Sequence, residues 1–130
     1  MHIVMVSGEY PPRWGGMGSV VYHLAGHMAQ RGHKVTVITR KHKKMPPTQT
    51  GVEVIPVRWA PLPMSFTRSF GKHAIKALKQ LDRRRTIDVV NAHLPLVSWS
   101  RKQFRFIEEN IAPVVSCLLY TSPSPRDPTK

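Results

Sequence analysis

The sequence predicts an α/β domain in which helices cover both faces of a parallel sheet. Three features predict it: short apolar runs rich in β-branched residues, helical apolar patterns between these runs, and loops with glycine or proline at the junctions. Strands that alternate with helices favour a parallel sheet, because each helix returns the chain to the edge where the next strand starts. The length of 130 residues suits one compact domain with its own core.

The first three elements form a strand–helix–strand unit. "HIVMVS" (2–7) is an apolar run typical of a buried strand, and "KVTVIT" (34–39) is a second one. Between them, "MGSVVYHLAGHMAQRGH" predicts a helix, with Gly32 as the residue just beyond its end. The apolar face of this helix has the spacing i, i+3, i+4, i+7 and consists of Val21, Leu24, Ala25 and Met28.

The rest of the chain continues the alternation of strands and helices. "VEVIPV" (52–57) predicts a third strand, and Pro56 near its end indicates an edge strand or a strand terminus, because proline has no N–H for a neighbouring strand. The remaining predicted elements are a helix at 66–85, a strand at 87–93, a helix at 95–110 and a strand that starts at 112.

Basic residues dominate the charge of the chain. It holds 20 lysines and arginines against 7 aspartates and glutamates, a formal net charge of +13, and the excess is concentrated in 31–44 and 72–85. Such a field attracts nucleic acid, anionic lipid headgroups or phosphorylated small molecules. The alternative is a solvated basic face that only raises solubility, and the sequence leaves both interpretations open.

No segment of the sequence indicates export or membrane insertion. No apolar run approaches the ~20 residues of a membrane span, and the start "MHIVMVS" lacks the basic leader and long apolar core of a signal peptide. The single cysteine, Cys117, excludes an internal disulfide. We therefore expect a cytoplasmic protein, and its basic charge adds the expectation of peripheral contact with the inner face of the membrane.

Three glycines, Gly15, Gly16 and Gly18, fall where the loop after the first strand meets the first helix. A tight turn, close packing or the approach of a phosphate would each require them. In an open α/β sheet, ligands bind beyond the carboxyl ends of the strands, and a helix N-terminus there favours an anion. The glycine spacing fits neither a dinucleotide fingerprint nor a Walker loop. We expect these glycines to contact a phosphate.

Two stretches resemble a known family. "MHIVMVSGEYPPRWGGMGSVVYHLAGHMAQRGHKVTVITRK" (1–41) and "DVVNAHLPL" (88–96) are similar to segments of the N-terminal domain of retaining, family-4-type nucleotide-sugar glycosyltransferases. The resemblance extends to about residue 116. It implies the N-terminal half of a GT-B architecture, in which two Rossmann-like domains face each other across a cleft. It also implies transfer of a hexosyl group from a nucleotide-sugar to a glycan, lipid or small-molecule acceptor.

The resemblance further implies roles for individual residues. The glycine loop approaches the donor diphosphate, and the first domain holds the acceptor. The implied donor-diphosphate residues are Gly15, Gly16, Met17 and Gly18, and the implied acceptor residues are Tyr10, Arg13, Trp14 and His93. No catalytic residue is identified. Neither a metal nor another cofactor is expected, because basic side chains and backbone amides stabilise the leaving diphosphate in this family.

Two departures from the family pattern limit these expectations. The fifth strand is not followed by the family's "T.HG" segment, and no second domain follows. From Cys117 the chain changes to "CLLYTSPSPRDPTK", whose composition cannot pack a core. We therefore expect an incomplete glycosyltransferase domain at 1–116, a disordered and artefactual tail at 117–130, and no transferase activity in the 130-residue chain itself.

A non-catalytic function is the alternative. A basic α/β module would dock on nucleic acid or on an anionic membrane surface, and Trp14, Trp59 and Trp99 interleave with basic residues as in nucleic-acid-binding proteins. No helix-turn-helix, RNP or zinc pattern accompanies them, which disfavours nucleic acid.

Overall fold

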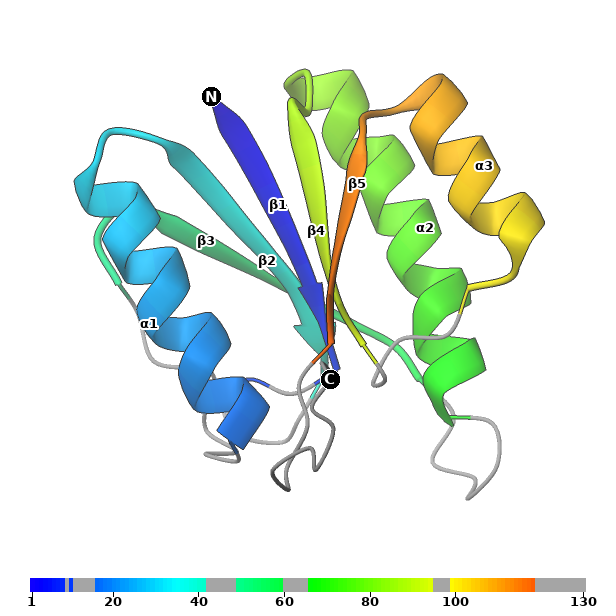
Figure 1. Ribbon diagram of the computed structural model, residues 1–130, viewed down its shortest axis with the longest axis horizontal. Coiled ribbons are helices and arrows are strands. Elements are labelled where there is room, and N and C mark those ends of the chain that lie inside the picture. The colour runs from blue at the N-terminus through cyan, green and yellow to red at the C-terminus, as the bar shows by residue number, and fades with distance from the viewer. Residues whose placement is uncertain (9, 11–15, 42–48, 60–65, 95–98, 119–130) are drawn as a thin grey trace, which may run out of the picture.

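The structure, a computed structural model, describes residues 1–8, 10, 16–41, 49–59, 66–94 and 99–118 (Figure 1). Helices and strands alternate within these ranges as the sequence predicts. In chain order they are β1 (His2–Ser7), α1 (Gly16–Gln30), β2 (Lys34–Arg40), β3 (Val52–Val57), α2 (Phe66–Arg84), β4 (Val89–Leu94), α3 (Arg101–Asn110) and β5 (Val114–Leu118).

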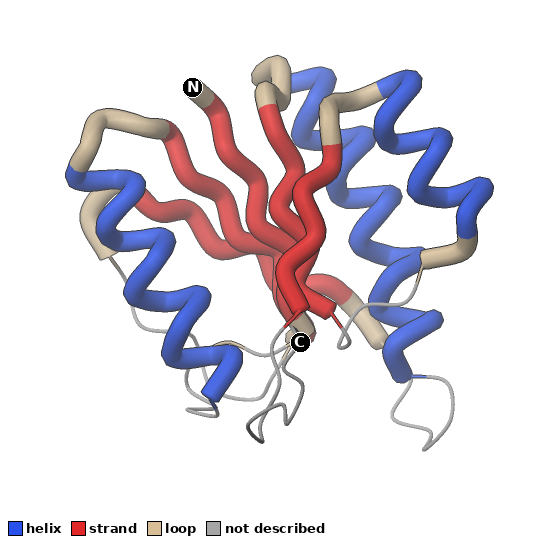
Figure 2. Tube along the Cα trace, viewed as in Figure 1, coloured by secondary structure: helices blue, strands red, loops and turns tan. Residues whose placement is uncertain are grey.

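The strands lie together in one sheet (Figure 2). Its five strands have the order β3-β2-β1-β4-β5, and every neighbouring pair is parallel. The predicted α/β class with a parallel sheet is therefore confirmed. β1 lies at the centre, and all six of its residues are buried, which explains its continuous apolar run. β3 lies at an edge, where Pro56 is tolerated because no further strand needs its N–H.

Helices cover both faces of the sheet, with α1 on one side and α2 and α3 on the other (Figure 1). On the α1 side, Ile3 and Met5 of β1 pack in a core with Val21 and Ala25 of the helix. On the other side, the buried residues Val4, Val6, Ile38, Val90, Phe70, Leu78 and Ile107 belong to one cluster. Successive residues of a strand point to opposite faces, so the parity of a residue number shows which core its side chain faces.

The ends of α1 and α3 follow local capping rules. α1 ends in a Schellman motif, in which His33 donates its N–H to the carbonyl of Met28 at 3.2 Å, and Gly32 adopts a φ of 94°. α3 starts at residue 101, well inside the predicted range, because Ser100 and Gln103 form a capping box. The Ser100 N–H donates to Gln103 Oε1 at 2.7 Å, and the Gln103 N–H donates to Ser100 Oγ at 3.2 Å.

The last strand crosses the predicted domain boundary. β5 runs from Val114 to Leu118, so the division after residue 116 falls inside it. The predicted tail lies outside the described residues from 119 onward, and the division into 1–116 and 117–130 stays a prediction. None of the described helices is long and apolar enough to cross a membrane.

Candidate functional site

One edge of the sheet brings together the ends of the strands and the start of α1. The carboxyl ends of β1, β2 and β4 lie at the same edge, and the first turn of α1 lies beside it (Figure 1). Gly16 opens α1, so the N–H groups of Gly16, Met17 and Gly18 belong to its first turn and point toward the helix N-terminus. The positive end of the helix dipole adds to these donors.

Three polar side chains lie on the α1 face of this edge. Ser7 pairs with His93 across β1 and β4. Val6 pairs with Ile38, which places Thr39, the next residue of β2, level with Ser7. Ser7 has the parity of Met5, and Met5 packs in the α1 core, so this row faces the same side as α1. All three side chains are buried.

Two polar atoms of this row are unsatisfied. Among the described residues, His93 Nε2 and Thr39 Oγ1 are the buried side-chain atoms with no hydrogen-bond partner. Leaving such an atom unpaired costs about 1–3 kcal/mol, so each is a candidate ligand contact. Burial lowers the pKa of His93, which keeps its imidazole neutral at physiological pH. The ring then offers one donor and one acceptor.

The structure narrows the three explanations for the glycines. Among the described residues, only Gly32 and Gly51 have a positive φ, so a left-handed turn does not account for Gly16 or Gly18. Gly18 is buried, which favours close packing at that position. Gly16 starts α1, and the approach of an anion to the helix terminus remains as the explanation for this glycine. Gly15 lies outside the described residues, and all four donor-site assignments stay predictions.

Tyr10 lies in the core and not on an open surface. Its side chain has no exposed area, its hydroxyl donates to Gln49 Oε1 at 3.3 Å, and its ring centroid lies 5.9 Å from that of Tyr22. This placement is that of a core residue on the α1 side of the sheet. Its predicted contact with an acceptor is untested, and Arg13 and Trp14 lie outside the described residues.

We expect Tyr10 to titrate far above an ordinary tyrosine. Burial, with a smaller effect of Tyr22, raises its pKa from 10.0 to about 12. The unfolded chain loses this proton near pH 10 and the folded chain keeps it, so the contribution of Tyr10 to stability is lost as the pH rises from 10 to 12. The phenolate absorbance of the chain minus that of Tyr10→Phe isolates Tyr10. This difference should rise with a midpoint near pH 12. A difference curve centred at 10 would show that the ring is exposed.

Arg40 connects residues that follow β1 and β3, on the α2 side of the same edge. It is buried, its Nε donates to the carbonyl of Gly8 at 2.5 Å, and its guanidinium carbon lies 4.7 Å from the ring centroid of Trp59. Trp59 in turn donates its Nε1–H to the carbonyl of Lys41 at 2.9 Å. Arg40 belongs to the basic stretch 31–44 but is buried, because the carbonyl of Gly8 and the ring of Trp59 replace its hydration.

Thr39 and Arg40 were not identified from residue patterns. Both come at the end of β2, at the carboxyl edge of the sheet. That position is a usable signal for Thr39, since polar residues at carboxyl ends of parallel strands face the ligand edge. Nothing in the local sequence distinguishes buried Arg40 from the exposed Lys41 that follows it.

The parallel sheet and the helices that cover both of its faces define a Rossmann-like domain. The profile of the family described as Glycosyltransferase Family 4 matches residues 14–117. The chain belongs to this family.

Relatives and solved structures agree with this membership. Glycogen synthase of Mycobacterium tuberculosis is 37% identical over 119 residues, which cover 75% of this chain and 29% of that protein. A phosphatidylinositol N-acetylglucosaminyltransferase component of Arabidopsis thaliana is 28% identical and shares 72% of this chain and 22% of its own length. The catalytic domain of starch synthase IV from Arabidopsis thaliana, bound to ADP and acarbose, superposes with a TM-score of 0.70 at 16% identity, over 90% of this chain and 33% of that one. The chain thus spans about a third or less of these proteins, and its fold is that of GT-B glycosyltransferases.

Proposed function

We propose that this chain is the acceptor-side domain of a retaining glycosyltransferase that transfers a hexosyl group from a nucleotide-sugar. Family membership supports the transfer of sugars, and the named relatives include a glycogen synthase and a component of an N-acetylglucosaminyltransferase. The observation that carries the proposal is the first turn of α1 beside the row that contains His93. The N-terminus of α1 and the neutral imidazole of His93 lie at the same end of the sheet (Figure 1).

The amides of the first turn would stabilise the leaving diphosphate. Negative charge grows on the phosphate oxygens as the bond to the sugar breaks, and fixed N–H donors near that charge lower the barrier. Gly16, Met17 and Gly18 supply such donors, and Gly16 has no side chain to block the approach. Since amides can hold the diphosphate without a metal, we expect transfer without added divalent cations.

His93 would contact the acceptor or the transferred sugar. Its buried Nε2 has no partner among the described residues, and the ring is neutral because burial lowers its pKa. A sugar hydroxyl both donates and accepts hydrogen bonds, so it matches a ring with one donor and one acceptor. Tyr10 would act indirectly, through the Gln49 contact that fixes its loop, and Arg13 and Trp14 complete the proposed acceptor side.

Peripheral contact with an anionic membrane, on the cytoplasmic side, is part of the proposal. A relative is named for a phosphatidylinositol acceptor, and the solved structure of WaaG, a glycosyltransferase involved in lipopolysaccharide biosynthesis, shares the fold with a TM-score of 0.54. The net charge of +13 would favour such a surface.

A domain graft tests the proposed function. The 130-residue chain alone should transfer no sugar from UDP-, ADP- or GDP-glucose, because it covers only 29% of its glycogen synthase relative. Residues 1–117, placed in the corresponding segment of that synthase, should restore transfer, and His93→Ala in the graft should lower kcat/KM by about a hundredfold. Circular dichroism would show that both grafts fold. A graft that keeps full activity with His93→Ala would contradict the assigned role.

A further inference from the structure

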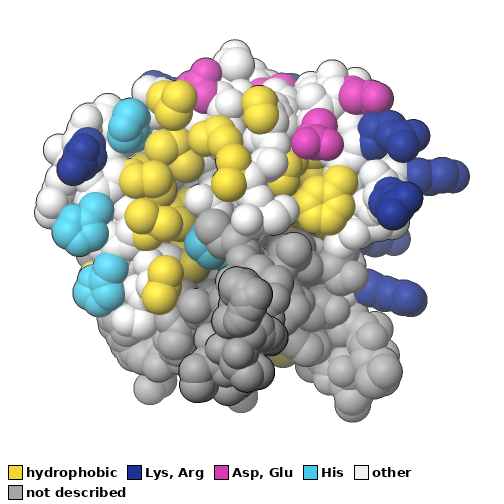
Figure 3. Space-filling model, in the orientation of Figure 1, with side chains coloured by type: hydrophobic (Ala, Val, Ile, Leu, Met, Phe, Trp, Pro, Cys, Tyr) yellow, Lys and Arg dark blue, Asp and Glu magenta, His cyan; other side chains and the backbone are white. Residues whose placement is uncertain are grey.

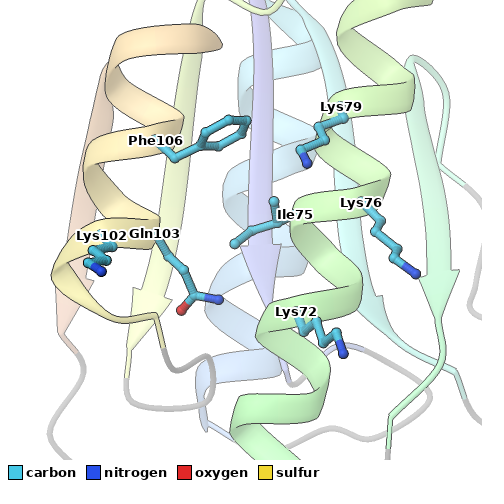
Figure 4. Close-up of a pocket in the computed structure, with 7 residues that line it drawn as sticks. All are labelled: Lys72, Ile75, Lys76, Lys79, Lys102, Gln103 and Phe106. Atoms are coloured by element: carbon cyan, nitrogen blue, oxygen red, sulfur yellow. The ribbon is translucent and has the colours of Figure 1, made fainter.

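A basic groove lies between α2 and α3, on the face of the sheet opposite α1. Its volume is about 320 Å³. Figure 4 shows side chains from both helices around it, with the ring of Phe106 directed toward α2. The lining residues are Lys72, Ile75, Lys76, Lys79, Lys102, Gln103 and Phe106.

The groove combines positive charge with an apolar floor. All four of its lysines are exposed and no acidic residue lines it, whereas Ile75 is buried and Phe106 is 36% exposed. Lys79 Nζ lies 4.8 Å from the ring centroid of Phe106, a cation–π contact that holds the ring at the surface. The space-filling view of Figure 3 shows lysines and arginines that project on this side of the molecule. A site of this kind suits a ligand whose phosphates contact the exposed lysines and whose hydrocarbon part contacts Ile75 and Phe106.

We propose that the α2–α3 groove docks the protein on an anionic phospholipid surface, with the lysines on headgroup phosphates and Phe106 at the boundary with the acyl chains. This proposal rests on the membrane contact proposed above and not on the transfer reaction. Lysines near an anionic leaflet are attracted by its surface potential, and aromatic rings favour the interface.

The lining chemistry favours lipid over nucleic acid. Its cations are lysines, which are flexible point charges that follow mobile headgroups, whereas arginine is the residue suited to bidentate contacts with nucleic acid. Stacking of a base needs an open aromatic face, and Lys79 already covers one face of Phe106.

The groove also extends toward the end of the domain where the strands have their carboxyl ends. A second groove, lined by Arg68, Lys72, Trp99, Ser100 and Gln103, shares Lys72 and Gln103 with the first. It continues toward the start of α2, which lies at the same edge as the carboxyl ends of the strands (Figure 1).

Vesicle binding by the 130-residue chain tests the proposal. The chain should sediment with vesicles of phosphatidylcholine and phosphatidylglycerol in equal amounts, and not with phosphatidylcholine alone. Lys72→Gln/Lys76→Gln/Lys79→Gln should lower the partition coefficient by roughly a hundredfold, about fivefold per lysine. The matched control, Arg31→Gln/Arg58→Gln/Arg85→Gln, removes the same charge from exposed sites outside the groove and should lower it less than about threefold.

Lysine acetylation of the unmodified chain provides a second readout. Anionic vesicles should protect Lys72, Lys76, Lys79 and Lys102 and leave Lys34 reactive. Equal losses of vesicle binding in the two triple variants would overturn the proposal, and so would equal protection of all lysines from acetylation. A larger effect of the groove lysines on the binding of single-stranded RNA than on vesicle binding would also overturn it. Vesicle binding needs no nucleotide-sugar, so its failure would leave the transferase assignment intact, and an inactive graft would leave the docking proposal intact.

Discussion

Gly16→Leu should lower the affinity of the chain for UDP by about tenfold to a hundredfold and leave its stability unchanged or higher. The side chain would stand between the phosphate and the N–H groups of the first turn, which removes charge-assisted hydrogen bonds. Gly16 has no positive φ, and leucine is the better helix former by roughly 1 kcal/mol. Isothermal titration calorimetry and urea unfolding of the same samples would separate the two effects.

A substitution one turn further along the helix serves as the control. Val20 is 47% exposed on α1, so Val20→Leu changes the helix surface without approaching its terminus. UDP affinity should not change in this variant. If Gly16→Leu loses stability and keeps its UDP affinity, the glycine serves the packing of α1 and not an anion.

Phe70→Ala should lower the free energy of unfolding by about 3–5 kcal/mol. The Phe70 side chain has no exposed area and packs in the core between α2 and the sheet. The variant loses the transfer energy of the ring and leaves a cavity, against a total stability of roughly 5–15 kcal/mol for a domain. The midpoint of urea unfolding, read by circular dichroism, measures the loss.

Phe106→Ala provides a matched control for Phe70→Ala. Both remove a phenyl ring, but Phe106 is 36% exposed at the rim of the groove, so its loss should cost about 1 kcal/mol or less. Similar losses in the two variants would show that α2 does not pack on the sheet as described.

Residue patterns predicted the fold well because each element carried its own signal. The apolar run of β1, the amphipathic face of α1 and Gly32 beyond its end all follow from period and backbone conformation. The start of α3 was missed, because the capping box of Ser100 is a short signal that the less regular apolar pattern before it obscured.

The site was less predictable because burial depends on which elements become neighbours. His93 and the glycines were identified through their family motifs, and the parallel register then brought His93 next to Ser7. The burial of Arg40 requires Gly8 and Trp59 to meet it from beyond the ends of β1 and β3, and no local pattern encodes that meeting. The groove likewise joins lysines of α2 to Phe106 of α3, which the sequence separates by the whole of β4.

An NMR titration of the ¹⁵N-labelled chain with UDP tests most directly whether the start of α1 binds a diphosphate. We predict saturable shifts of the Gly16, Met17 and Gly18 amides, together with the imidazole of His93, at a salt concentration that screens weak surface binding. Shifts confined to α2 and α3, with the first turn of α1 unchanged, would contradict the assignment of the diphosphate site.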